Sequence, residues 1–134
     1  MKKHDFNIVL KNFLNAQHDT IKVRLDYLTE GEDVVLYPLP GGKVEKVFMD
    51  TSQEVSLPYE IAIKLKNQEV ANAYLMAINT ALSDFSLDLP SKNGSYSFID
   101  LSISEPFLNQ RDEHGYYIYL LDIVAKLEIE SEED

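Results

Sequence analysis

Histidines and acidic residues are the side chains of this sequence whose types could support catalysis or metal binding. His4, His18 and His114 lie far apart along the chain, and none has a partner at a metal-ligand spacing such as H-E-x-x-H. The run Asp112-Glu113-His114 could bind a cation or supply acid–base groups, but a polar hairpin turn explains it more simply. The chain has no cysteine, which excludes disulfides, thiolate nucleophiles and cysteine-ligated metal sites.

Glycine-containing motifs and carboxylates do not favour an enzyme either. Pro40-Gly41-Gly42-Lys43 superficially resembles a phosphate-binding loop, but a P-loop is longer and continues with Ser or Thr where this chain has Val44. Neither a G-x-G-x-x-G nor a G-x-S-x-G motif is present. The 23 acidic residues make chance carboxylate pairs common, and a catalytic pair also needs a cleft that shifts its pKa. We therefore expect no catalytic residue, no metal site and no cofactor.

Length and charge indicate one globular domain with an acidic surface. The chain has 134 residues, 45% of them hydrophobic, and its 23 acids against 12 bases give a formal net charge of −11. This surplus disfavours a protein whose main task is to bind nucleic acid, because non-specific binding to phosphates needs a cationic surface. Since no 18 apolar residues run together and no signal peptide is evident, we expect neither a membrane span nor export.

Apolar spacing predicts two main helices, at about 5–16 and 67–85. The first has apolar residues at i, i+3, i+4, i+7 and i+8 from Phe6, which form one helix face, and Asp5 is placed to cap it. The second follows Asn67, a suitable N-cap, and keeps helical apolar spacing throughout.

Alternation of apolar and polar residues predicts strands between and after these helices. Strands are expected at 21–27, 34–37, 44–49, 59–65, 96–103 and 117–129. We expect a bulge near Phe98-Ile99, a polar connection at Glu105–Gly115 and an acidic tail at 128–134. Strands divided by polar turns, with only two helices, predict a single α+β domain over residues 1–127 with a largely antiparallel sheet.

The last predicted strand is unusual because its first half is apolar on both faces. Tyr116 to Leu121 leave no face for water, so both sides must be covered. One interpretation is a central strand with a helix on one side and sheet or loop on the other. The second is that one face meets a neighbouring subunit, where tyrosine is favoured.

Several local patterns follow one another in the order found in a known family. They are Val34–Gly41, in which a short strand runs into a Pro-Gly turn, Phe48-Met49-Asp50, Tyr59–Lys66 leading into the second helix, Ile99–Phe107, Asp112–Gly115 and Tyr117–Leu120. Together they resemble the phage minor capsid protein family, which corresponds to the tail terminators of long-tailed phages. One departure is Asp50-Thr51, where similar sequences are expected to have Asp-Gly, and this leaves the geometry of that turn open.

The resemblance implies a structural virion protein. Such a protein assembles with itself into a ring, expected to be a hexamer, which caps the tail tube, stops its polymerisation and provides the head–tail joining surface. Its partners would be the major tail tube protein and a head-completion or connector protein, with DNA passing through the lumen without specific binding. It would act in the host cytoplasm during assembly and then reside at the head-proximal end of the tail in the virion.

The expected subunit or tube interface combines the polar connection with the two-faced strand. Its candidate residues are Pro106, Phe107, Leu108, Arg111, Asp112, Tyr116, Ile118 and Leu120. A head-to-tail ring interface suits an edge strand or a strand that is apolar on two faces. We also expect acids on the lumen face, since phosphates would find no countercharge there. The alternative function is a small acidic protein-binding adaptor module without catalytic activity.

Overall fold

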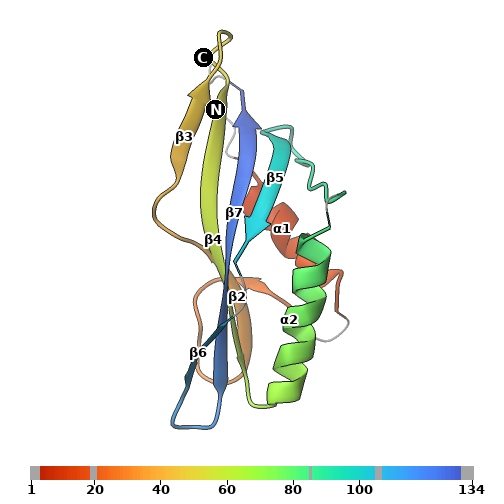
Figure 1. Ribbon diagram of the computed structural model, residues 1–134, viewed down its shortest axis with the longest axis vertical. Helices are drawn as coiled ribbons and strands as arrows, with labels where there is room; N and C mark the ends of the chain where they lie inside the picture. Colours follow the sequence, from red (N-terminus) through yellow and green to blue (C-terminus); the bar gives the residue numbers. More distant parts are fainter. Residues whose placement is uncertain (1–3, 19–20, 85, 105–106, 131–134) are drawn as a thin grey trace.

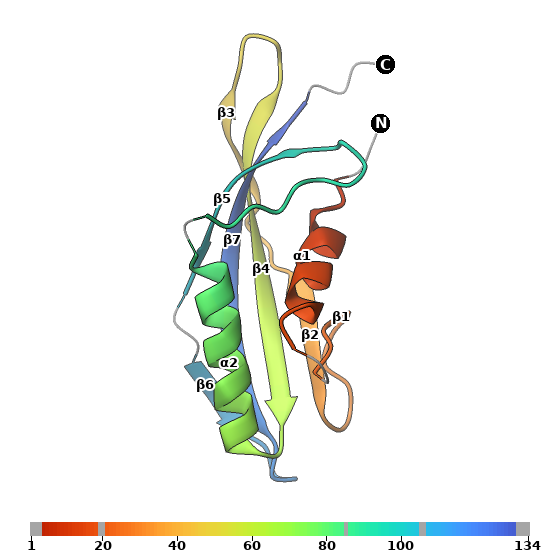
Figure 2. The same cartoon turned by 90° about the vertical axis from the view of Figure 1, so that its right-hand side faces the viewer.

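Two helices lie against one face of a long twisted sheet in the computed structural model of the chain (Figures 1 and 2). The structure describes residues 4–18, 21–84, 86–104 and 107–130. In chain order the elements are α1 (Phe6–Asn15), β1 (Arg24–Leu25), β2 (Asp33–Pro38), β3 (Lys43–Val47), β4 (Gln53–Leu65), α2 (Gln68–Leu82), β5 (Ser97–Ile103), β6 (Phe107–Arg111) and β7 (Tyr117–Ile129). The predicted α+β class with two main helices is confirmed.

The sheet is built around β4 and β7, which have 13 residues each. They pair antiparallel along their whole length, from Gln53 opposite Ile129 to Leu65 opposite Tyr117. At one end, here called the β3 end, β3 flanks β4 and β5 flanks β7. At the other, the β6 end, β2 flanks β4 and β6 flanks β7. Only the short pairing of β1 with β2 is parallel among the described strands, so the sheet is largely antiparallel as predicted.

The core fills the space between this sheet and the two helices. Alternate side chains of β4 and β7 point into it, and Ile61, Ile63, Leu121 and Ile123 are fully buried there. The helices bring in large side chains, which include Phe6, Leu10 and Leu14 from α1 and Tyr74 and Ile78 from α2. Both described helices pack on this one face, and no part of the chain that the structure describes forms a helix on the other face.

The two helices begin close to where the sequence predicts, but for different reasons. The side chain of Asn67 caps α2 as expected and accepts a hydrogen bond from the backbone N–H of Val70 at 3.1 Å. Asp5 stands at the start of α1, but its carboxylate does not cap that helix. It accepts hydrogen bonds from the Ser91 hydroxyl at 2.7 Å and the Lys92 N–H at 3.0 Å, and so ties a distant turn to the helix.

The second helix is shorter than predicted. It ends at Leu82, and Phe85 lies outside the described residues. Asp84 explains the end, because its carboxylate accepts hydrogen bonds from the backbone N–H and the hydroxyl of Ser86 at 2.9 and 2.7 Å. Such a local side-chain contact offers the backbone a turn in place of another helical residue.

Three strand boundaries also differ from the predictions. The strand expected at 21–27 is reduced to β1. It ends at Leu25, where the Asp26 carboxylate accepts the N–H of Tyr27 at 2.8 Å and the chain turns away from the sheet. In contrast, β4 begins at Gln53, six residues before the predicted start, because its polar first residues pair with strands on both sides. The predicted polar connection Glu105–Gly115 contains β6, which pairs with the apolar start of β7.

Other turn and bulge predictions are confirmed. The register of β5 against β7 shifts between Phe98 and Asp100, which places the expected bulge at Ile99. Gly94 has a φ of 74°, as expected for Asn93-Gly94. β7 runs to Ile129 and therefore extends two residues into the segment expected as an acidic tail. Residues 131–134 of that segment lie outside the described residues.

The turn of the β3–β4 hairpin adopts a conformation that its sequence does not favour. The Thr51 N–H donates to the Phe48 carbonyl at 2.9 Å, and the Phe48 N–H donates to the Ser52 carbonyl at 2.9 Å. Closing this turn places Thr51 at a φ of 68°, the one positive φ of a non-glycine residue in the described chain. The turn therefore keeps the geometry of an Asp-Gly pair although a β-branched residue stands in the glycine position.

Replacing Thr51 by glycine should stabilise the protein by about 1 kcal/mol, because glycine avoids the steric cost of a left-handed conformation. Thr51→Asn should gain less, since asparagine tolerates this region better than threonine but not as freely as glycine. Thr51→Val keeps the branched side chain and should gain nothing. Denaturant unfolding followed by circular dichroism measures these differences, and a glycine variant no more stable than the parent contradicts the assignment of strain.

Candidate interaction surfaces

The turn between β6 and β7 is held by Asp112. Its Oδ1 accepts the backbone N–H groups of His114 at 3.0 Å and Tyr116 at 2.9 Å, and Gly115 supplies a φ of 89°. Burial alone would raise the pKa of the Asp112 carboxyl, but these two N–H groups hold the pKa below its usual value. The hairpin-turn interpretation of Asp112-Glu113-His114 is thus confirmed. His114 is exposed at the tip, far from His4 and His18 in the chain.

Cationic and aromatic side chains gather beside this turn. The Lys64 and Lys66 Nζ atoms lie 4.9 and 5.1 Å from the centroid of the Tyr116 ring, within the range of cation–π attraction. Lys64 also approaches the Asp112 carboxylate at 3.9 Å. Lys64, Lys66 and Tyr116 line a shallow hollow of about 630 Å³ together with Glu30, Gly31 and His114. The two lysines are thus accompanied there by the carboxylate of Glu30 and lie near that of Asp112.

The predicted interface residues fall on this same β6–β7 hairpin. Pro106 lies outside the described residues, whereas Phe107, Leu108 and Arg111 belong to β6. The Leu108 side chain is 46% exposed, and the guanidinium of Arg111 lies 5.4 Å from the centroid of the Tyr117 ring. Asp112, Tyr116, Ile118 and Leu120 follow along the turn and β7. The structure therefore brings the described candidates together on one hairpin at the β6 end.

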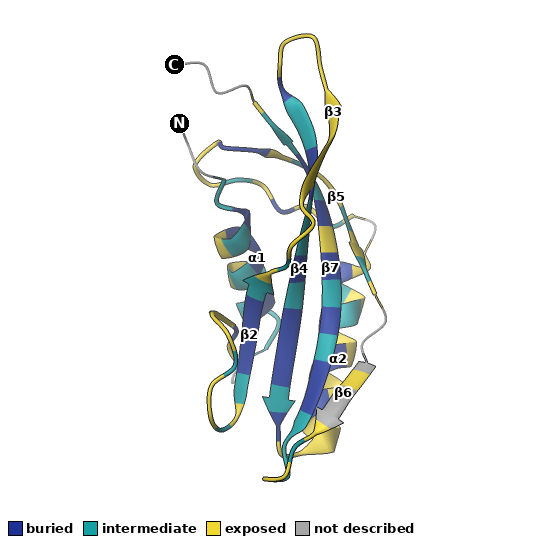
Figure 3. Ribbon diagram, turned by 90° about the vertical axis from the view of Figure 1, so that its left-hand side faces the viewer, coloured by how far each residue is buried: buried dark blue, intermediate teal, exposed yellow. Residues whose placement is uncertain are grey.

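The two-faced strand β7 is central in the sheet, with β4 on one side and β5 and β6 on the other (Figure 3). Its core face packs against the helices, as the first interpretation requires. On the opposite face Ile118 is buried and Leu120 is half-buried, although no described helix lies there. They lie beside Val35 and Ala62, which are fully buried on the same face. That face is thus apolar towards the β6 end without a second layer of described helices or strands.

A polar cluster interrupts this face one step further along the strands. Glu60 lies directly opposite Tyr37 on β2 and Asp122 on β7, and the Tyr37 hydroxyl donates a hydrogen bond to the Glu60 carboxylate. Burial raises the pKa of Glu60, and the neighbouring Asp122 raises it further. Within the described residues, Oδ1 of Asp122 is buried without a hydrogen-bond partner.

The β3 end exposes apolar side chains that the sequence prediction did not single out. The β3–β4 hairpin projects beyond the rest of the sheet (Figures 1 and 2). Val44, Val47, Phe48 and Met49 are exposed on it, and Met49 at the tip is fully accessible to solvent. The sequence analysis predicted only a short strand at 44–49 and did not consider the exposure of its apolar side chains.

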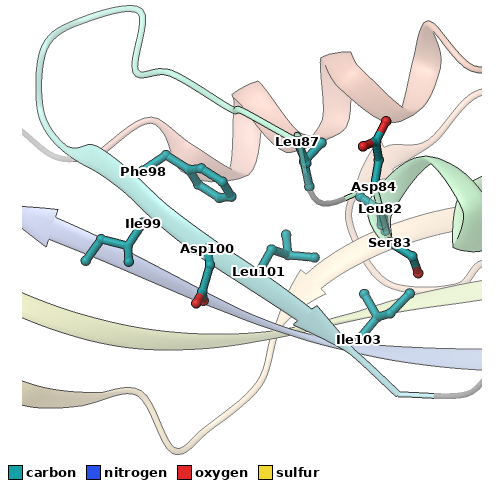
Figure 4. Close-up of a pocket in the computed structure, with 9 residues that line it drawn as sticks. All are labelled: Leu82, Ser83, Asp84, Leu87, Phe98, Ile99, Asp100, Leu101 and Ile103. Atoms are coloured by element: carbon teal, nitrogen blue, oxygen red, sulfur yellow. The ribbon is translucent and has the colours of Figure 1, made fainter.

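A hollow of about 320 Å³ opens beside β5 (Figure 4). Its floor comes from β5 side chains, and its opposite wall from the end of α2 and the segment that follows. The lining residues are Leu82, Ser83, Asp84, Leu87, Phe98, Ile99, Asp100, Leu101 and Ile103. The hollow is largely apolar and Asp84 contributes a carboxylate, whereas the Asp100 carboxylate is directed to the other side of β5 (Figure 4).

A family model described as bacteriophage tail terminator protein matches residues 9–129. The chain belongs to this family. The match spans both helices and all the strands, except for the first residues of α1, and it confirms the resemblance drawn from the sequence. No curated protein matches the chain. As a member of the tail terminator family, the chain is a structural protein of the phage tail and a component of the virion.

Two further observations describe this tail terminator family member. None of its described helices combines the length and the apolar character needed to span a bilayer. Among residues 4–18, 21–84, 86–104 and 107–130, no three or more acidic or histidine side chains converge to hold a metal ion.

Glu60 should make the protein lose stability as the pH rises. The folded state holds the Glu60 proton more tightly than the unfolded state. The free energy of unfolding therefore begins to fall at about pH 4.5, the ordinary pKa of this glutamate, and continues to fall until the pH has passed the raised pKa of the folded state. Glu60→Gln mimics the protonated form and should remove this part of the slope. Glu54→Gln, on the same strand and face, is the matched control. Unfolding by denaturant between pH 4 and 8 measures the slope, and an unchanged slope in Glu60→Gln contradicts the assignment.

Proposed function

We propose that the chain assembles into a ring, a hexamer in its simplest form, which caps the tail tube and stops its polymerisation. The observation that carries this proposal is the family match over residues 9–129. The ring then provides the surface on which a head-completion or connector protein joins the tail. In this proposal termination is a binding event that needs no covalent chemistry, because the ring occupies the growing end and does not recreate it on its far side.

The two ends of the molecule support a cap with unlike faces. At the β6 end, Tyr116 lies beside Lys64 and Lys66 in a hollow lined mainly by charged and polar side chains. At the β3 end, the hairpin tip presents Phe48 and Met49 to solvent. A ring whose two rims differ in this way can bind one partner on each rim without propagating the tube, since neither rim reproduces the other.

The β6–β7 hairpin is the surface that we assign to the major tail tube protein. Leu108 and Arg111 are exposed on β6, which is an edge strand, and unpaired edges readily bind another chain. We further propose that the lumen of the ring carries a net negative charge, in keeping with the formal charge of −11 for each copy. DNA then passes without binding, because its phosphates meet no countercharge.

Loss of the protein should give overlong or headless tails in electron micrographs of infected cells, because nothing stops tube growth. Supplying the wild-type chain should restore tails of uniform length. Supplying the double variant Leu108→Glu, Arg111→Glu should not, since it places two carboxylates on the proposed tube surface. Circular dichroism checks that the variant folds.

Met76→Glu is the matched control, because Met76 is 71% exposed on α2, away from β6. It should restore normal tails. Normal tail length in the absence of the protein contradicts the proposed function. Full restoration by the double variant contradicts only the assignment of the β6–β7 hairpin.

A further inference from the structure

The β3 end of the sheet has two free strand edges. In this region the strand order is β3, β4, β7, β5, and no described strand pairs with the outer edge of β3 or of β5. A free edge presents unpaired N–H and C=O groups that can extend the sheet with another chain. Both edges are therefore available to a partner strand.

The directions of these strands select how two copies can join. All three pairings among the four strands are antiparallel, so β3 and β5 run in opposite directions (Figure 1). When two copies stand side by side in the same orientation, β3 of one copy is antiparallel to β5 of the next. The alternation of the sheet then continues across the boundary, and every further copy can join in the same way, which is the rule of a head-to-tail ring.

Side chains on the helix side of the two edges are complementary. Val44 lies opposite the core residue Val55, so it points to the side of the sheet that the helices cover. Neither of the described helices reaches β3, and Val44 remains 49% exposed (Figure 2). On β5 the same side carries Phe98 and Leu101, which line the hollow of about 320 Å³ (Figure 4). A strand added to β5 places its apolar side chains over this hollow.

Charges on the helix-free side favour the same pairing. The ladders place Lys43 opposite Ser56, Ser56 opposite Lys126, and Lys126 opposite Asp100, so Lys43 and Asp100 lie at the same level on the same face. Lys46 also points to this face, opposite Glu54. Two β3 edges would bring lysines together and two β5 edges would bring Asp100 residues together, whereas β3 against β5 pairs opposite charges.

We infer that β3 of one copy pairs antiparallel with β5 of the next copy, with Val44 beside Phe98 at the hollow and Lys43 beside Asp100. The partner is thus a second copy of this chain. The inference rests on the proposed function in one respect, because it supplies the subunit contact of the proposed ring. It assigns that contact to the β3 end and leaves the β6–β7 hairpin for a different partner.

The absence of cysteine from the chain allows a direct test by cross-linking. Lys43→Cys and Asp100→Cys are made as separate variants, mixed at high micromolar concentration and oxidised. The mixture should yield a disulfide-linked pair, and each variant alone should not. Disulfides within a single variant would indicate a symmetric β3–β3 or β5–β5 dimer and would overturn the inference. Met76→Cys on α2, mixed with Lys43→Cys, is the control for random collision.

A charge exchange provides a second, independent measurement. Lys43→Glu should weaken self-association by about tenfold, which corresponds to about 1.4 kcal/mol, and Asp100→Lys in the same chain should restore it. Light scattering after size-exclusion chromatography measures the association, and circular dichroism verifies the fold. Equal weakening by Lys43→Glu with and without Asp100→Lys contradicts the pairing.

The outcomes separate this inference from the proposed function. A ring that forms in solution without the Lys43–Asp100 cross-link overturns the β3–β5 contact and leaves the capping role intact. A protein that stays monomeric at several hundred micromolar and gives no cross-link also overturns the contact. The capping role itself is contradicted only by tails of normal length in the absence of the protein.

Discussion

The antiparallel ladder between β4 and β7 is the interaction on which the remaining structure depends. Each of the other strands except β1 pairs directly with one of these two, β2 and β3 with β4, and β5 and β6 with β7. Their 13 paired residues bury an unbroken row that includes Ile61, Ile63, Leu121 and Ile123, on which both helices pack. Because side chains alternate across a strand, a slip of one residue would turn this whole row to the helix-free face. The register of this ladder therefore determines which side chains lie on each of the surfaces described above.

Much of this framework follows from short-range patterns in the sequence. Apolar spacing located both helices, and the alternation from Tyr117 to Ile129 predicted β7 with its correct bounds. Boundaries were missed where a side chain or a partner strand competes with local preference. Asp84 ends α2 through a turn with Ser86, and the polar start of β4 is extended because strands on both sides satisfy its backbone. Neither contact can be inferred from residue types alone.

The candidate surfaces were less predictable because they depend on which side chains remain exposed to solvent once the chain has folded. The described candidates between 107 and 120 did converge on one hairpin, since they are close in the sequence. The hollow beside β5 is lined by residues from distant segments, such as Leu82 and Leu101. Lys43 and Asp100 lie at the same level only because the registers of four paired strands place them there. Asp5 illustrates the same difficulty, because it was expected to cap its own helix but binds Ser91 and Lys92. Such contacts between distant segments appear only when the sheet is assembled.

The length of β4 and β7 has a consequence for the dimensions of an assembly. At about 3.3 Å per residue, a strand of 13 residues spans about 43 Å. In a ring whose axis runs along these strands, that length is the height of the wall, and the ladder acts as a molecular ruler for it. In the proposed ring the hairpins at the two ends would then form the opposite rims, and the separation of the two proposed partner surfaces would follow from the number of paired residues within one chain.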